Sequence, residues 1–148
     1  MAVGALSELT KEIPVPMSNL PTAMRNRIAT YLAGAGAPAA ISGVFLDLYN
    51  GDPQASGTSV LATLSGSATR PNITSSLGAA ANGVVTSTAV VTPFASAAAA
   101  ATVTHFALFD AATGGNLIAS GPMSTGTQSL NAGNGFQFNA GTITLSSN

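Results

Sequence analysis

The sequence has no cysteine, no tryptophan and very few charged side chains. Its 148 residues include four basic residues, five acidic residues and one histidine, and only 5% are aromatic. Charged residues make up 6% of the chain, whereas an average soluble domain has about 25%. The absence of cysteine excludes disulfides and thiolate metal sites. The length suits one domain that buries roughly two-thirds of its unfolded surface.

The scarcity of charge also excludes several classes of function. A net charge of −1 with four basic residues does not provide the cationic surface that nucleic-acid binding needs. No segment has the ~20 apolar residues that would span a membrane. Glu8, Lys11 and Glu12 lie where a secretory signal would have its apolar stretch, so we expect no secretion by that route.

Catalytic groups are equally scarce. His105 is the only histidine, so a zinc site with two imidazoles cannot form within one chain. A relay between His105 and Asp110 is disfavoured because an odd offset puts them on opposite faces of a strand. A carboxylate pair would have to come from Asp47, Asp52 and Asp110, yet the last two stand in turn sequences, where Asp commonly bonds its own backbone. We therefore expect no enzyme, no cofactor, no metal site and no small-molecule substrate.

The first part of the chain is predicted to be an arm. Three apolar residues have roughly the spacing of one helical face, but Pro14 and Pro16 would stop a helix there. These apolar residues are Leu6, Leu9 and Ile13. An arm that docks on a partner and a frayed terminus both remain open.

An amphipathic helix of about 13 residues is predicted next. Ser18 or Asn19 can cap it, Pro21 suits its first turn, and Gly34 ends it. Its apolar stripe consists of Met24, Ile28, Tyr31 and Leu32. We expect this stripe to pack on the domain itself.

From Ile41 onward the apolar residues alternate with a period of two. In residues 41–49, Leu46 and Leu48 share one face and Asp47 lies on the other. The expected strands are 41–49, 59–64, 70–75, 84–92, 102–109, 116–120, 127–130, 136–139 and 142–146. Turn sequences such as Asn82-Gly83 separate them. The pattern predicts an all-β fold, an antiparallel jelly-roll-like sandwich with one N-terminal helix and an extended N-terminal arm.

The expected organisation is one globular unit with two parts. Residues 1–40 form the arm and helix, and residues 41–148 form the β-sandwich. Within the sandwich, residues 102–109 carry apolar side chains on both faces, which indicates a central strand covered on both sides. In a two-layer sandwich the second cover could be a neighbouring subunit.

Several stretches of the chain resemble a family of small virion proteins of tailed bacteriophages. Residues 102–126 (TVTHFALFDAATGGNLIASGPMSTG) carry the main likeness. Residues 48–53 are similar to the family's Leu-x-x-Gly-Asp-Pro, and residues 130–138 to its Leu-x-x-Gly-x-x-Phe-x-Phe. These stretches are spread over most of residues 41–148 in matching order. Members are labelled tail-fibre proteins or capsid decoration (cement) proteins, so the resemblance implies a β-sandwich virion component.

The leading hypothesis is a capsid decoration (cement) protein that binds across major capsid subunits and stabilises the shell. It would be made in the bacterial host cytoplasm and lie on the outer capsid surface of the virion. We expect it to contact the major capsid protein and copies of itself, as a dimer or trimer, and to bind no nucleic acid or membrane. The candidate capsid-facing residues are Leu6, Leu9, Ile13, Arg25 and Arg27.

Low charge supports this hypothesis because short, neutral side chains lose little entropy when neighbours cover them. A low-charge proteome is the other explanation of the composition.

The alternative function is a tail fibre or a tail-tip adaptor that binds a receptor. Such a module usually exposes tryptophan or tyrosine for stacking on sugars, and this chain has two tyrosines and no tryptophan. A hydrolase is a third possibility, for which the sequence offers no site.

Overall fold

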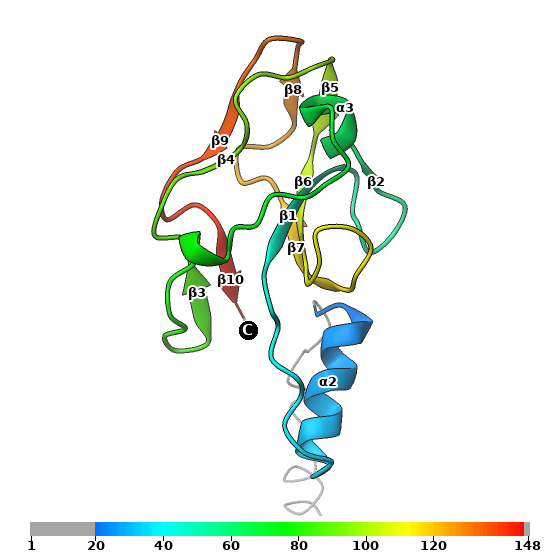
Figure 1. Cartoon of the computed structure of the whole chain (residues 1–148), viewed down its shortest axis with the longest axis vertical. Helices are drawn as coiled ribbons and strands as arrows, with labels where there is room; N and C mark the ends of the chain where they lie inside the picture. Colours follow the sequence, from blue (N-terminus) through cyan, green and yellow to red (C-terminus); the bar gives the residue numbers. More distant parts are fainter. Residues whose placement is uncertain (1–19, 147–148) are drawn as a thin grey trace, which may run out of the picture.

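The structure, a computed structural model, describes residues 20–146. A β-rich body carries one main helix, α2, which projects from one end of it (Figure 1). The helical elements are α2 (Thr22–Leu32), α3 (Leu61–Ser65) and a 3₁₀ helix (Thr74–Ser76). The strands are β1 (Phe45–Asn50), β2 (Thr58–Ser59), β3 (Val84–Thr86), β4 (Val91–Phe94), β5 (Ala101–Val103), β6 (His105–Phe109), β7 (Leu117–Pro122), β8 (Gln128–Leu130), β9 (Phe136–Phe138) and β10 (Thr144–Ser146).

The central element is a four-stranded sheet with the order β2-β1-β6-β7. Its strands are antiparallel, and the register of β1 and β6 places Leu46 opposite Leu108 and Asp47 opposite Ala107. Three further antiparallel pairs join β3 to β10, β4 to β9 and β5 to β8. The predicted all-β antiparallel sandwich with one N-terminal helix is confirmed.

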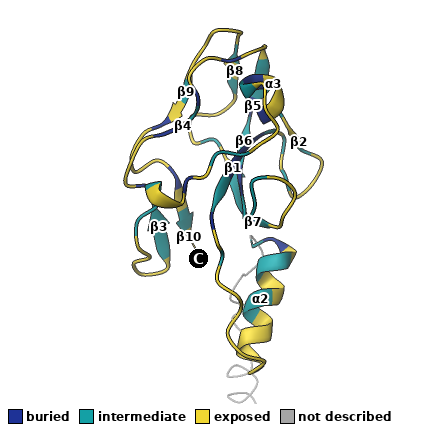
Figure 2. Cartoon of the chain, viewed as in Figure 1, coloured by how far each residue is buried: buried dark blue, intermediate teal, exposed yellow. Residues whose placement is uncertain are grey.

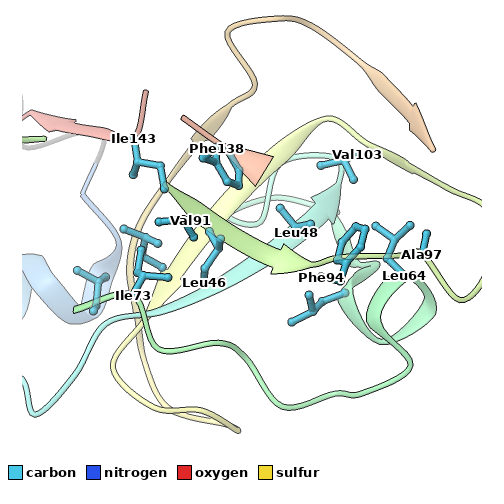
Figure 3. Close-up of a cluster of buried hydrophobic side chains, with 13 residues drawn as sticks. Leu46, Leu48, Leu64, Ile73, Val91, Phe94, Ala97, Val103, Phe138 and Ile143 are labelled. Carbon is cyan, nitrogen blue, oxygen red and sulfur yellow. The ribbon is translucent and has the colours of Figure 1, made fainter. Parts of the chain in front are cut away.

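The hydrophobic core lies against one face of the four-stranded sheet. Leu46, Leu48 and Leu108 are fully buried there. Val91 of β4 and Phe138 of β9 join the same cluster (Figure 3). The alternation predicted for β1 is therefore confirmed, because its even-numbered leucines face the core and Asp47 lies on the other face.

Several predicted strands are interrupted or replaced. Residues 59–64 contain only the last residue of β2 and then most of α3, because Leu61 and Leu64 are three positions apart and both are buried on one helical side. Residues 70–75 form an isolated bridge at Asn72 and the start of the 3₁₀ helix instead of a strand.

Two long predicted strands are each divided in the structure. Residues 84–92 contain β3 and the start of β4, which pair with different strands. Residues 102–109 divide at Thr104, where the backbone N–H of Thr104 donates to the Tyr49 carbonyl at 2.9 Å. β5 then pairs with β8, whereas β6 pairs with β1 and β7.

Helix α2 begins directly after Pro21, which takes the N-cap position without a side-chain hydrogen bond. The predicted caps, Ser18 and Asn19, lie outside the described residues. Gly34, with a φ of +76°, follows its last turn as predicted. Met24 packs against the core, but Tyr31 is 57% exposed and Leu32 is 75% exposed. The expectation that the whole apolar stripe packs on the domain is wrong, because the helix extends past the end of the β-rich body (Figure 1).

The burial of leucine in the core can be tested against a matched exposed leucine. We expect Leu108→Ala to lower the free energy of unfolding by about 2–5 kcal/mol, because it removes buried methyl groups and leaves a cavity. Leu32→Ala, the control on the exposed end of α2, should change it by less than about 0.5 kcal/mol. Urea unfolding measures both, and equal losses would contradict the core described above.

Candidate functional site

A buried ion pair covers the second face of the four-stranded sheet. Asp47 on β1 is 2% exposed, and its Oδ2 accepts a hydrogen bond from Nε of Arg70 at 2.8 Å. Its Oδ1 accepts from the backbone N–H of Leu48 at 2.8 Å and from the hydroxyl of Ser59 at 2.7 Å. The carboxylate is therefore paired and bonded on both oxygens, as a buried charge requires.

The Arg70 side chain also holds the turn that follows β6. Its guanidinium carbon lies 3.6 Å from the centre of the Phe109 ring, a cation–π contact. Its Nη1 donates to the carbonyls of Ala111 at 3.3 Å and Gly114 at 2.7 Å. The backbone N–H of Arg70 donates to the Ala112 carbonyl at 3.0 Å. The chain's own residues thus contribute a cover on this side of β6, for which the sequence had left a neighbouring subunit as one possible source.

This ion pair was missed in the sequence because its partners are far apart in the chain. One signal was available. Asp47 shares a face with Phe45 and Tyr49 on a largely apolar strand, so its carboxylate needs a cation if that face is covered. Arg70 is the only basic residue after Arg27.

His105 and Asp110 do not form a catalytic relay. His105 begins β6, and its Nδ1 lies 2.9 Å from Oγ1 of Thr104. Asp110 follows the other end of β6 and accepts hydrogen bonds from the backbone N–H of Asn116 at 2.6 Å and from its side-chain amide at 3.0 Å. The role predicted for Asp110, in a turn, is confirmed.

The other carboxylates of residues 20–146 also bond to nearby groups. Asp52 accepts the backbone N–H of Gln54 at 2.8 Å, as its predicted turn role requires, and Asp47 is in the ion pair. Within residues 20–146 no group of three potential metal ligands comes together. No helix in this described range has the length and hydropathy to cross a membrane.

The sequence-predicted capsid-facing residues divide into two groups. Leu6, Leu9 and Ile13 lie outside the described residues. Arg25 is exposed on α2 and donates to the Thr22 hydroxyl at 3.1 Å. Arg27 donates to the carbonyl of Ala39, which ties α2 to the segment that leads back to the sheet.

The end of α2 furthest from the β-rich body is the most exposed apolar feature of the described chain. Tyr31 and Leu32 stand there, and residues 31–40 are exposed throughout (Figure 2). A hollow of about 550 Å³ lies between α2 and residues 38–42, with Asp110 and Asn116 on its far side. This projecting unit can contact a neighbouring molecule without disturbing the core.

Two apolar hollows adjoin each other on the β-rich body. The first, which we call the β7 groove, measures about 460 Å³ and is lined by residues 118–122 of β7, residues 144–146 of β10, and the apolar side chains around them. The second, the aromatic hollow, measures about 580 Å³ and is lined by Phe106, Phe136 and Phe138 together with amide and hydroxyl side chains. Both include Phe106, and neither is lined by a charged residue. These surfaces suit neutral partners.

Two titrating groups in this region have shifted pKa values. Burial, and then the negative charge of Asp47, raise the pKa of the Tyr49 hydroxyl. Hydrogen bonds from the side chain and then the backbone of Asn116 hold the pKa of Asp110 below its ordinary value of 3.8. The shifts move both pKa values away from neutral pH, upward for Tyr49 and downward for Asp110.

The ion pair makes a direct prediction about stability. Arg70→Leu leaves the Asp47 carboxylate buried without its cation and should lower the free energy of unfolding by about 3–5 kcal/mol. Arg70→Lys keeps the charge but loses the planar fork, so it should restore only part of the loss. Arg25→Leu on exposed α2 is the control and should behave like wild type in urea unfolding. A wild-type midpoint for Arg70→Leu would contradict the role assigned to the pair.

Asp110 makes a prediction about acid stability. Because its folded pKa is lowered, its contribution is complete above the unfolded value of 3.8 and is lost as the pH falls through the lower folded pKa. Asp110→Asn should therefore flatten the fall of the thermal midpoint below about pH 4. If Asp110→Asn follows the wild-type curve, the Asn116 bonds do not stabilise the ionised form.

Comparison with known proteins gives one family. The family model described as "Podophage GP4 fiber I protein gp80" matches residues 19–146, which include α2 and every described strand. A search of curated proteins gave no match. The resemblance to a phage structural family is confirmed, and the match names a fiber protein rather than a capsid decoration protein. The chain belongs to the family of the podophage GP4 fiber I protein gp80 and is a structural protein of the bacteriophage virion.

Proposed function

We propose that this chain is a fibre subunit of the virion, and that it acts by passive binding rather than by catalysis. The observation that carries the proposal is the family match over residues 19–146, which takes in both the β-rich body and projecting α2. This favours the fibre alternative over the decoration role that led the sequence analysis. The binding surface would be neutral and apolar.

The positions of the charged residues support this kind of binding. Asp47 and Arg70 bond each other. Asp52 and Asp110 bond their own turns. Among residues 20–146 this leaves the two arginines of α2 as the remaining charges. Contacts that residues 20–146 make to neighbours would therefore depend mainly on shape, apolar burial and neutral hydrogen bonds, which vary little with salt.

Helix α2 is the element best placed to attach the β-rich body to a larger assembly. Only its first turns pack on that body, through Met24. Its far end presents Tyr31 and Leu32 to solvent. In an assembled fibre these side chains would be buried, and burying an apolar side chain is worth about 1.5–3 kcal/mol. The same contact repeated in a symmetric particle gives a firm attachment from modest individual contacts.

Capsid decoration is the second candidate function, with the major capsid protein as partner. The neutral surface favours it, since permanent neighbours make surface charge unnecessary. A receptor-binding fibre module would present tyrosine or tryptophan at a sugar-binding hollow. Here Tyr49 is only half exposed, and Tyr31 lies on α2, away from the two hollows of the β-rich body, which favours decoration. Arg25, Arg27 and the apolar residues of the arm would then face the capsid.

Locating the protein on intact virions separates the two functions. We expect electron cryo-microscopy of virions carrying a C-terminal affinity tag, labelled with a tag-specific antibody fragment, to place the protein in fibres. Untagged virions exposed to the same fragment are the control. Label spread over the faces of the head would reject the fibre role and support decoration, and the copy number from quantitative mass spectrometry would give the same distinction.

A further inference from the structure

Strand β7 forms an open edge of the four-stranded sheet within the described residues. The sheet order ends at β7, whose other neighbour is β6. Its residues 118–122 all line the β7 groove. Successive residues of a strand point to opposite faces, so a hollow bordered by five in succession runs along the edge of the strand. The groove therefore has the shape needed to receive an extended segment.

The opposite wall and the floor of the groove are also suited to a peptide. Residues 144–146 of β10 line the far wall in succession, and β10 pairs with β3 on one side. Phe106, Ile118 and Leu145 supply apolar surface, and no charged side chain lines the groove. An extended segment there could donate and accept backbone hydrogen bonds along β7, which is the β-augmentation mode of peptide binding.

The position at which the described chain begins indicates what this segment is. Leu20 is the first described residue, and it lines the β7 groove. The segment of residues 1–19 is therefore joined to the described chain at the rim of this groove. Within this segment, residues 3–9 (VGALSEL) contain no proline, so each can donate a backbone hydrogen bond. Val3, Ala5 and Leu9 fall on one side of a strand, and Glu8 falls on the other.

The prolines favour a neighbouring copy's groove over the chain's own. Pro14 and Pro16 lie between residues 3–9 and Leu20, and a proline-rich spacer is semi-rigid and extended. To enter its own groove, the segment would have to reverse direction across this spacer. Nineteen extended residues reach on the order of 60 Å, enough for the segment to meet the groove of an adjacent subunit.

We propose that residues 3–9 of one copy bind in the β7 groove of a second copy as an added strand. Mutual exchange would close a dimer, and exchange in one direction around a ring would close a trimer. The link concerns contacts between copies, so it applies in a fibre and on the head alike, but on the head it assigns Leu9 to the neighbouring copy instead of the capsid surface. Virion labelling therefore tests a separate claim.

Disulfide trapping tests the exchange in the full chain, which has no cysteine of its own. One variant carries Ala5→Cys and the other Ala119→Cys, a half-exposed residue lining the β7 groove. The second chain is lengthened by a tag, and the two are unfolded, mixed, refolded and oxidised. We expect a disulfide between the two different chains, detected by gel electrophoresis and mass spectrometry. The matched control replaces Ala119→Cys with Ala62→Cys, an exposed residue of α3 that does not line the groove.

The outcomes are distinct. A yield about tenfold above the Ala62→Cys control, as local concentration in a specific complex provides, supports exchange. A chain carrying both Ala5→Cys and Ala119→Cys that forms only an intramolecular disulfide shows that the arm fills its own groove, and this overturns the proposal. A yield equal to the control overturns it as well.

A second measurement addresses assembly without cysteine. We expect Leu9→Asp to reduce the oligomer seen by light scattering to monomer, because a buried carboxylate in an apolar groove is costly. Its urea midpoint, extrapolated to low protein concentration, should match that of wild type, which separates lost assembly from lost folding. An oligomer that survives Leu9→Asp in full would show that residues 3–9 do not hold the copies together.

Discussion

The rest of the structure depends on one buried charge, the carboxylate of Asp47. It lies on the central strand β1 at a position whose neighbours in the register are Ala107 and, beyond it, Ser120. These small residues leave space above the sheet, and Arg70 crosses that space to reach the carboxylate. A buried charge without a partner is strongly destabilising. The backbone on both sides of Arg70 must therefore follow a course that brings its guanidinium to Asp47.

The same guanidinium determines the shape of the neighbouring loop. Its bonds to the carbonyls of Ala111 and Gly114 hold the turn between β6 and β7, and Asp110 closes that turn through Asn116. Arg70, Asp47 and Asp110 thus form their hydrogen bonds within the fold. Few charges remain on the surface of residues 20–146, and this is the physical basis for the proposal that neighbours are bound through apolar contacts. The projecting end of α2 and the groove beside β7 are where such contacts are available.

Much of the fold could be predicted wherever a local pattern matched the final environment. The alternation of Leu46, Asp47 and Leu48 correctly assigned the two faces of β1. The helix after Pro21 and the hairpin turn at Asn82-Gly83 were also predictable, because a helix stop or a two-residue turn depends on backbone preferences of a few residues. The predictions failed where distant partners decide. Residues 61–65 became a helix because Leu61 and Leu64 pack into a core built by other strands, and Thr104 divides one apolar run because its two halves pair with different strands.

The candidate site follows the same division. The sequence alone determined that the protein is β-rich, nearly neutral and poor in catalytic groups, because composition and periodicity need no knowledge of tertiary contacts. The resemblance to phage virion proteins also came from ordered turn motifs in the chain. Only the tertiary structure decided that Asp47 and Arg70 form a pair, that the far end of α2 is exposed, and that β7 and β10 enclose a groove. Each of these depends on which segments meet in space, and residues far apart in the chain carry no local signal of that meeting.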